Sequence, residues 1–192
     1  MPTYSEDEIR DLIEGKLSWE MLKRMMSSPK DSDRFETYVA VLQKRVSWQD
    51  RILLPLAEHL YIVQKGESRV VKCDCGHEFG DYRQNWKLEA LINVRDTDAK
   101  LGEVYIGPRV GENGGSRRTE LREYYCPGCG LQLEVEAVPP GYHALFDFLP
   151  DLDAFYARWL EKPLPSGTEK EWFVDKTYEV TSEWANELKS SK

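Results

Sequence analysis

The chain has 192 residues, of which 41% are hydrophobic and 31% charged. This length and composition predict one folded domain with appendages and argue against two independent cores. Its 34 acidic and 26 basic residues give a formal net charge of -8. Because nucleic acids and anionic membrane surfaces attract proteins with an excess of Lys and Arg, this balance disfavours both as main partners.

The N-terminus gives no sign of export or membrane insertion. The first eight residues are acidic and lack the apolar core of a signal peptide. No apolar run approaches the roughly 20 residues that span a bilayer. We therefore expect a soluble, cytoplasmic protein.

The first third of the chain has the apolar period of helices. Ser5 and Glu8 match a capping box at the start of a first helix, and Ser18 is placed to cap a second. Apolar residues recur at helical spacing over residues 35–46, which predicts a third helix. Each helix shows one apolar stripe, suited to packing on the chain's own core or on a partner. We assign residues 1–58 to a helical N-terminal segment.

From about residue 59 the apolar period changes to two, which predicts strands. The segments with this pattern are residues 60–63, 69–72, 86–94, 120–125 and 131–138. In the last segment the odd-numbered apolar residues share one face, and Gln132, Glu134 and Glu136 share the other. This alternation is typical of a half-buried antiparallel strand. We assign residues 59–145 to an antiparallel β zinc-binding domain, for the reasons given below.

The C-terminal part is predicted to contain a short helix and a tail. The helix follows Pro150, and its expected apolar face consists of Leu152, Phe155, Tyr156 and Trp159. The tail after Pro165 is charged but contains four aromatic residues, so we expect it to lie on another surface. We assign residues 146–192 to a C-terminal helix and docking tail. Residues 107–116 are rich in glycine and predict a mobile loop or hairpin connection.

The four cysteines occur as two pairs, Cys73 with Cys75 and Cys126 with Cys129, each after a predicted strand. The second pair lies in the sequence Cys-Pro-Gly-Cys-Gly, which is typical of a zinc-ribbon knuckle. The last glycine relieves a tight turn, so that backbone N–H groups can point at the sulfur atoms. Paired cysteines in a reducing compartment are more often metal ligands than disulfides. We predict an α+β fold with N-terminal helices, a central antiparallel β region with one four-cysteine zinc site, and short C-terminal helices.

Alternatives to this zinc site remain open at the level of sequence. Two disulfides would need an oxidising compartment, and free buried thiols would not explain the glycines. His77, inside the first knuckle, is a candidate to replace one cysteine as a ligand. Four thiolates leave no open position for water, so we expect the zinc to organise the fold. The sequence contains no glycine-rich nucleotide-binding motif and no His-Glu-x-x-His motif, so we assign no catalytic and no cofactor-binding residue.

A basic cluster supports a competing interpretation. It consists of Arg109, Arg117, Arg118 and Arg122, around the glycine-rich loop. Such a cluster suits a free-standing zinc-ribbon protein that binds nucleic acid or a protein partner. The net charge of -8 opposes this alternative.

Several longer motifs follow one another in the order of one known family. They are SPKD at 28–31 leading to RF at 34–35, CDCGHEF at 73–79, NWKL at 85–88 leading to VRDT at 94–97, REYYCPGCG at 122–130, and residues 147–159. From the N-terminal helices to about Pro165, the chain resembles the small gamma subunits of bacterial acetone carboxylases.

This resemblance implies a non-catalytic subunit of a large cytoplasmic complex, an (αβγ)2 heterohexamer. Such ligases carboxylate acetone to acetoacetate with bicarbonate and ATP and without biotin. Related complexes act on butanone or acetophenone. In that family the nucleotide chemistry and a manganese ion (Mn2+) belong to the large alpha and beta subunits, whereas gamma carries zinc (Zn2+). The resemblance implies that the four cysteines are the zinc ligands and that the chain alone is inactive.

Overall fold

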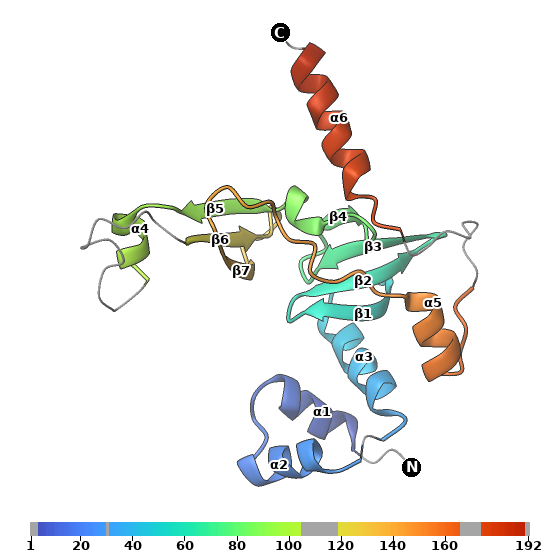
Figure 1. Cartoon of the computed structure of the whole chain (residues 1–192). Helices are drawn as coiled ribbons and strands as arrows, with labels where there is room; N and C mark the ends of the chain where they lie inside the picture. Colours follow the sequence, from blue (N-terminus) through green and yellow to red (C-terminus); the bar gives the residue numbers. More distant parts are fainter. Residues whose placement is uncertain (1–3, 30, 105–118, 166–173, 191–192) are drawn as a thin grey trace.

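The computed structural model describes residues 4–29, 31–104, 119–165 and 174–190. Within these ranges the chain has N-terminal helices, two antiparallel sheets and short C-terminal helices, which confirms the predicted α+β fold (Figure 1). The glycine-rich segment 107–116 and residues 166–173 of the tail lie outside the described residues.

Three helices form a group at the N-terminal end of the molecule (Figure 1). They are α1 (Glu6–Ile13), α2 (Trp19–Ser27) and α3 (Arg34–Arg45). Ser5 forms the predicted capping box, because its Oγ accepts from the Glu8 N–H at 3.2 Å and its own N–H donates to the Glu8 carboxylate at 2.8 Å. Ser18 caps α2 through its side chain alone, whose Oγ accepts from the Met21 N–H at 3.2 Å. Ile9 and Met25 are buried in a small core between these helices.

Four antiparallel strands form the first sheet, in the order β1-β2-β3-β4. They are β1 (Arg51–Ala57), β2 (Leu60–Lys65), β3 (Ser68–Cys73) and β4 (Glu78–Asp81). β1 lies within residues 1–58, which we assigned to a helical segment. That assignment is therefore wrong at the C-terminal end of the segment. Pro55 interrupts the strand pattern in the sequence. The sheet tolerates Pro55 because β1 is an edge strand with a register shift between Pro55 and Ala57.

Three antiparallel strands form the second sheet, in the order β5-β6-β7. They are β5 (Leu91–Arg95), β6 (Glu120–Tyr125) and β7 (Gln132–Val138), with a 3-10 helix η1 (Trp86–Glu89) before β5 and α4 (Asp98–Gly102) after it. The strand predicted over 86–94 is therefore wrong in its first half. There the Asn85 side chain accepts a hydrogen bond from the Lys87 N–H at 3.2 Å and begins a helical turn that buries Trp86 and Lys87.

From Glu134 to Val138 the faces of β7 are the reverse of the predicted ones, whereas Leu133 packs partly buried against the main core. Val135 is 50% exposed, whereas Glu136 on the opposite face is only 6% exposed. The acidic face is the buried one because the Lys87 ammonium lies against it and pairs with Glu134 and Glu136. Alternation of residue types thus located the strand correctly and oriented residues 134–138 wrongly.

The C-terminal part packs on the first sheet and then leaves it. Its elements are α5 (Leu152–Ala154), the π-helix η2 (Phe155–Trp159) and α6 (Thr177–Ser190). Leu152 and Tyr156 enter the main core, where the Tyr156 hydroxyl donates to the Leu53 carbonyl at 2.8 Å. Trp159 is 80% exposed, because the wider turn of the π-helix moves it off the predicted apolar face. Among the described residues, no helix has the length and apolar character needed to cross a membrane.

Candidate metal centre

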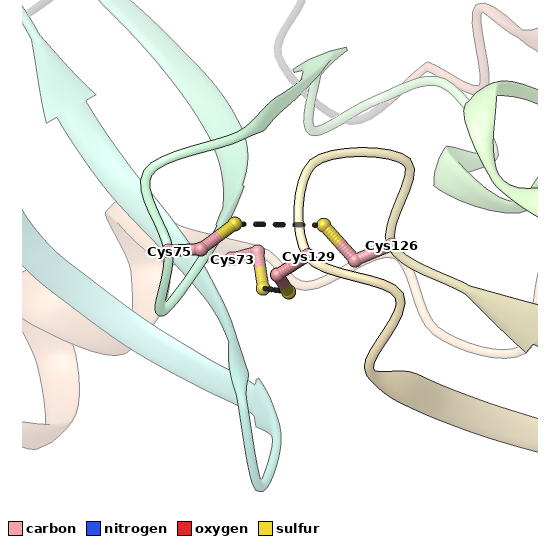
Figure 2. Close-up of side chains that lie close together, drawn as sticks. All are labelled: Cys73, Cys75, Cys126 and Cys129. Atoms are coloured by element: carbon pink, nitrogen blue, oxygen red, sulfur yellow. Dashed lines mark hydrogen bonds between the residues drawn. The ribbon is translucent and has the colours of Figure 1, made fainter.

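Two loops bring the four cysteine side chains together between the sheets (Figure 2). Cys73 ends β3 and Cys75 lies in the turn before β4, while Cys126 and Cys129 lie in the loop between β6 and β7. All four sulfur atoms lie within 4.8 Å of one another. The structure therefore unites the four positions that the sequence singled out.

The sulfur separations fit a metal site better than disulfides. The Sγ atoms of Cys75 and Cys126 are 3.6 Å apart, and those of Cys73 and Cys129 are 3.9 Å apart. Four thiolates in a tetrahedron around zinc, with Zn–S bonds of about 2.3 Å, stand about 3.8 Å from one another. A disulfide would need an S–S distance of about 2.0 Å, and all four cysteines are free.

Each knuckle closes through its glycine as predicted. Gly76 and Gly130 adopt φ values of 95° and 72°, a left-handed conformation that glycine adopts without steric cost. The Gly76 N–H donates to the Cys73 carbonyl at 2.9 Å, and the Gly130 N–H donates to the Cys126 carbonyl at 2.8 Å. These turns place the second sulfur of each pair beside the first.

A third glycine, Gly128, allows the two knuckles to lie close together. A Cβ atom built on Gly128 would stand 2.9 Å from the Cβ of His77 and 3.3 Å from the Sγ of Cys75. Any larger residue at position 128 would push the loops apart. No pattern in the sequence indicates this role, because the contact joins loops that are far apart along the chain.

Burial and backbone hydrogen bonds act in opposite directions on the thiols. Burial raises the pKa of the Cys73 and Cys126 thiols. Burial acts in the same direction on Cys75, but the backbone N–H of His77 and the neighbouring thiols outweigh it, and the pKa of Cys75 is lowered. Metal ligation requires thiolates, so these N–H groups favour the form that binds.

Neighbouring residues fix the first knuckle from outside. The Trp48 indole N–H donates to the carbonyls of Cys73 and Asp74, at 3.2 and 3.1 Å. Asp74 also pairs with His59 Nδ1 at 2.5 Å. His77 packs edge-on against Phe79, with ring centroids 4.9 Å apart, and does not belong to the four-sulfur group. No pattern in the sequence pointed to Trp48.

A cluster of charged side chains lies on the buried face of β7, and it too was missed. Glu134, Glu136 and Asp147 bring carboxylate oxygens within 4.8 Å of one another, and the Lys87 ammonium pairs with all three. The Tyr124 hydroxyl donates to Glu136 at 2.8 Å. Although burial alone would lower the pKa of Lys87, the three carboxylates hold it above its usual value. The Lys87 ammonium lies where a metal ion would have to bind among the three carboxylates. The cluster is therefore an ion-pair network that attaches β7 to its surroundings.

Of the basic cluster predicted from the sequence, the structure describes Arg122, and its guanidinium already pairs within the chain. Arg122 pairs with Glu120 and also donates to the Tyr142 carbonyl. Arg109, Arg117 and Arg118 lie outside the described residues.

Comparison with known proteins agrees with this picture. Residues 46–160 match the family model described as "Acetone carboxylase gamma subunit". The chain is 46% identical over 164 residues to the acetone carboxylase gamma subunit of Xanthobacter autotrophicus, an alignment that covers 84% of this chain and 96% of that protein. It is also 32% identical over 88 residues to the acetophenone carboxylase beta subunit of Aromatoleum aromaticum, covering 44% of this chain and 65% of the relative.

Proposed function

The chain belongs to the acetone carboxylase gamma subunit family, and on this basis we propose that it is the zinc-binding small subunit of a ketone carboxylase. The observation that carries the proposal is the group of four cysteine sulfurs within 4.8 Å of one another. This group lies inside the segment that matches the family model. We assign to the subunit a structural role in assembly and no catalytic residue.

Cys73, Cys75, Cys126 and Cys129 are the proposed zinc ligands. A zinc ion held by four thiolates supplies a rigid cross-link and no open position for substrate. The cross-link would join the end of β3 to the loop between β6 and β7, and so fix one sheet relative to the other. Trp48 fixes the backbone of the first knuckle, and the knuckle N–H groups bond the sulfur atoms of Cys73 and Cys75.

The reaction itself is assigned to the partner chains. The complex would convert acetone and bicarbonate to acetoacetate with ATP and without biotin. Its alpha and beta subunits would carry ATP and manganese, and assembly would be an (αβγ)2 heterohexamer in the cytoplasm. Activated ketone and carboxyl intermediates react with water, so a small subunit that braces the large ones helps to exclude it.

Metal analysis of the purified protein tests the zinc assignment. We expect about one zinc per chain. Cys75→Ser and Cys129→Ser should each lose most of it, because each removes one of four ligands. His77→Ala is the matched control inside the same knuckle and should keep its zinc. A metal-free parent protein, or equal loss from His77→Ala, would contradict the assignment.

Affinity purification tests the carboxylase assignment. The tagged chain, expressed in its native source, should recover two large subunits in equal amounts, and the recovered complex should hydrolyse ATP only with ketone and bicarbonate present. The chain alone should show no such activity. Recovery of nucleic acid, with binding that weakens as salt is added, would instead support the free-standing zinc-ribbon alternative.

A further inference from the structure

We propose that the cysteine cluster is also a reversible redox site, at which a hydroperoxide oxidises Cys75 and a disulfide then forms between Cys75 and Cys126. This inference rests on the proposed function, since it concerns the four cysteines assigned there as zinc ligands. It adds a covalent modification to a site whose reduced form has a structural role.

The four sulfur atoms differ in their access to solvent. Cys73 and Cys126 are each 0% exposed. Cys75 and Cys129 are exposed. Thiolate character and exposure decide which cysteines are oxidised, and a cysteine that binds a metal is a thiolate already. An oxidant that arrives from solvent therefore reaches Cys75 and Cys129 before their buried neighbours.

Each exposed sulfur lies opposite a buried sulfur of the other knuckle (Figure 2). The Sγ atom of Cys75 is 3.6 Å from that of Cys126. The Sγ atom of Cys129 is 3.9 Å from that of Cys73. Disulfide formation would shorten the first distance to about 2.0 Å, a change that the two side chains can share. An oxidised Cys75 thus has a second thiolate in position to attack it.

The reaction takes two steps and consumes one hydroperoxide. The Cys75 thiolate attacks a peroxide oxygen and the O–O bond breaks, which gives a Cys75 sulfenic acid and a hydroxide or alkoxide ion. The Cys126 thiolate then attacks the Cys75 sulfur and expels hydroxide as the S–S bond forms. The two thiolates lose two electrons, which reduce the peroxide. Two protons from the solvent neutralise the two anions that leave.

The position of the new bond decides what the oxidised protein can do. Cys126 and Cys129 have the Cys-x-x-Cys spacing of disulfide oxidoreductases, so a bond within the second knuckle is the competing product. A bond between Cys75 and Cys126, which are 51 positions apart, instead joins the turn before β4 to the loop between β6 and β7. Two thiols are then left to hold the metal, which should be released. The disulfide would keep the two sheets connected in its place.

The experiment treats the full-length, zinc-loaded protein with one equivalent of hydrogen peroxide. We expect release of about one zinc per chain, measured with a chromogenic chelator. Mass spectrometry without reduction should find a peptide that links Cys75 to Cys126, and dithiothreitol with added zinc should reverse both changes. The control is the same protein unfolded in urea before oxidation. It should give a mixture of pairings, because four cysteines that are not held in place allow three connectivities.

Two matched variants test the order of the steps. Cys126→Ser removes the second sulfur, so the Cys75 sulfenic acid should persist and react with dimedone. Cys129→Ser also lacks one ligand but keeps the reacting pair, so the disulfide between Cys75 and Cys126 should still form. In the oxidised parent protein, amide hydrogen exchange in β6 should be slower than in the reduced protein after removal of zinc by a chelator.

The outcomes separate this inference from the proposed function. If the purified protein carries no zinc, both are wrong. If it carries zinc and one equivalent of peroxide leaves its thiols reduced, links Cys126 to Cys129 or gives products that dithiothreitol does not reverse, only the redox assignment is wrong. Mapping of the disulfide in the parent protein decides between these outcomes even where a serine variant fails to fold.

Discussion

Lys87→Met is the substitution that most directly tests how the second sheet is held. The Lys87 side chain is 1% exposed and pairs with Glu134, Glu136 and Asp147, whose side chains are 32%, 4% and 48% exposed. Methionine keeps an unbranched side chain, one atom shorter, and removes its charge. Water can still reach Glu134 and Asp147, but Glu136 would remain buried without its cation.

The size of the effect follows from that one carboxylate. Removal of one partner from a buried ion pair costs about 3–5 kcal/mol of stability. With a slope of about 2 kcal/mol per molar urea, this loss lowers the unfolding midpoint by about 2 M. The assay is urea unfolding at neutral pH, followed by circular dichroism, with zinc present in excess.

Two comparisons separate charge from shape. Lys16→Met makes the same change at a lysine that is 66% exposed and pairs with Glu14 at the surface, so its midpoint should stay close to that of the parent. Adding Glu136→Gln to Lys87→Met should recover most of the loss, because no buried charge is left. If Lys87→Met and Lys16→Met unfold at the same urea concentration, the reasoning about the buried network is refuted.

Two further predictions concern the knuckle and the response to acid. Gly128→Ala forces a Cβ to within 2.9 Å of the His77 Cβ and should weaken zinc binding about tenfold in chelator competition, whereas Gly102→Ala, with open space around it, should not. Hydrogen bonding to Lys65 lowers the pKa of Glu78. The stabilisation by Glu78 is therefore present above the usual glutamate pKa of about 4.3 and is lost as pH falls. The urea midpoints of the parent and Glu78→Gln should differ at neutral pH and converge below about pH 4.

The features that could be predicted from the sequence are local ones. The capping box at Ser5 needs only two residues three positions apart, and the turns at Gly76 and Gly130 need only the cysteines beside them. Strands β2, β3, β6 and β7 lie close to the predicted segments because an apolar period of two is a property of a few consecutive residues. The cysteine cluster could be predicted for the same reason.

The features that were missed depend on contacts between distant segments. Whether Glu136 is buried is decided by Lys87, which comes from another element, and alternation along β7 contains no information about that lysine. The closeness of Gly128 to His77 exists only once the two knuckles face each other. β1 was missed because Pro55 interrupts its strand pattern. A proline is tolerated in β1 only because this strand lies at the edge of the sheet, and that position is a property of the whole fold.

These distant contacts predict how the protein responds to loss of metal. The second sheet is joined to the first by the cysteine cluster and by the Trp86 ring of η1, which packs edge-on against Phe79 in β4 and against Tyr124 in β6. The Lys87 network holds β7 to η1, and β2 and β3 pair in continuous register within the first sheet. Removal of zinc by a chelator under reducing conditions should therefore speed amide hydrogen exchange at Cys126 and in β6, and leave Ile62 in β2 protected. Equal loss of protection at both sites would mean that the metal supports the entire fold, and unchanged exchange at Cys126 would mean that the cysteines hold no metal.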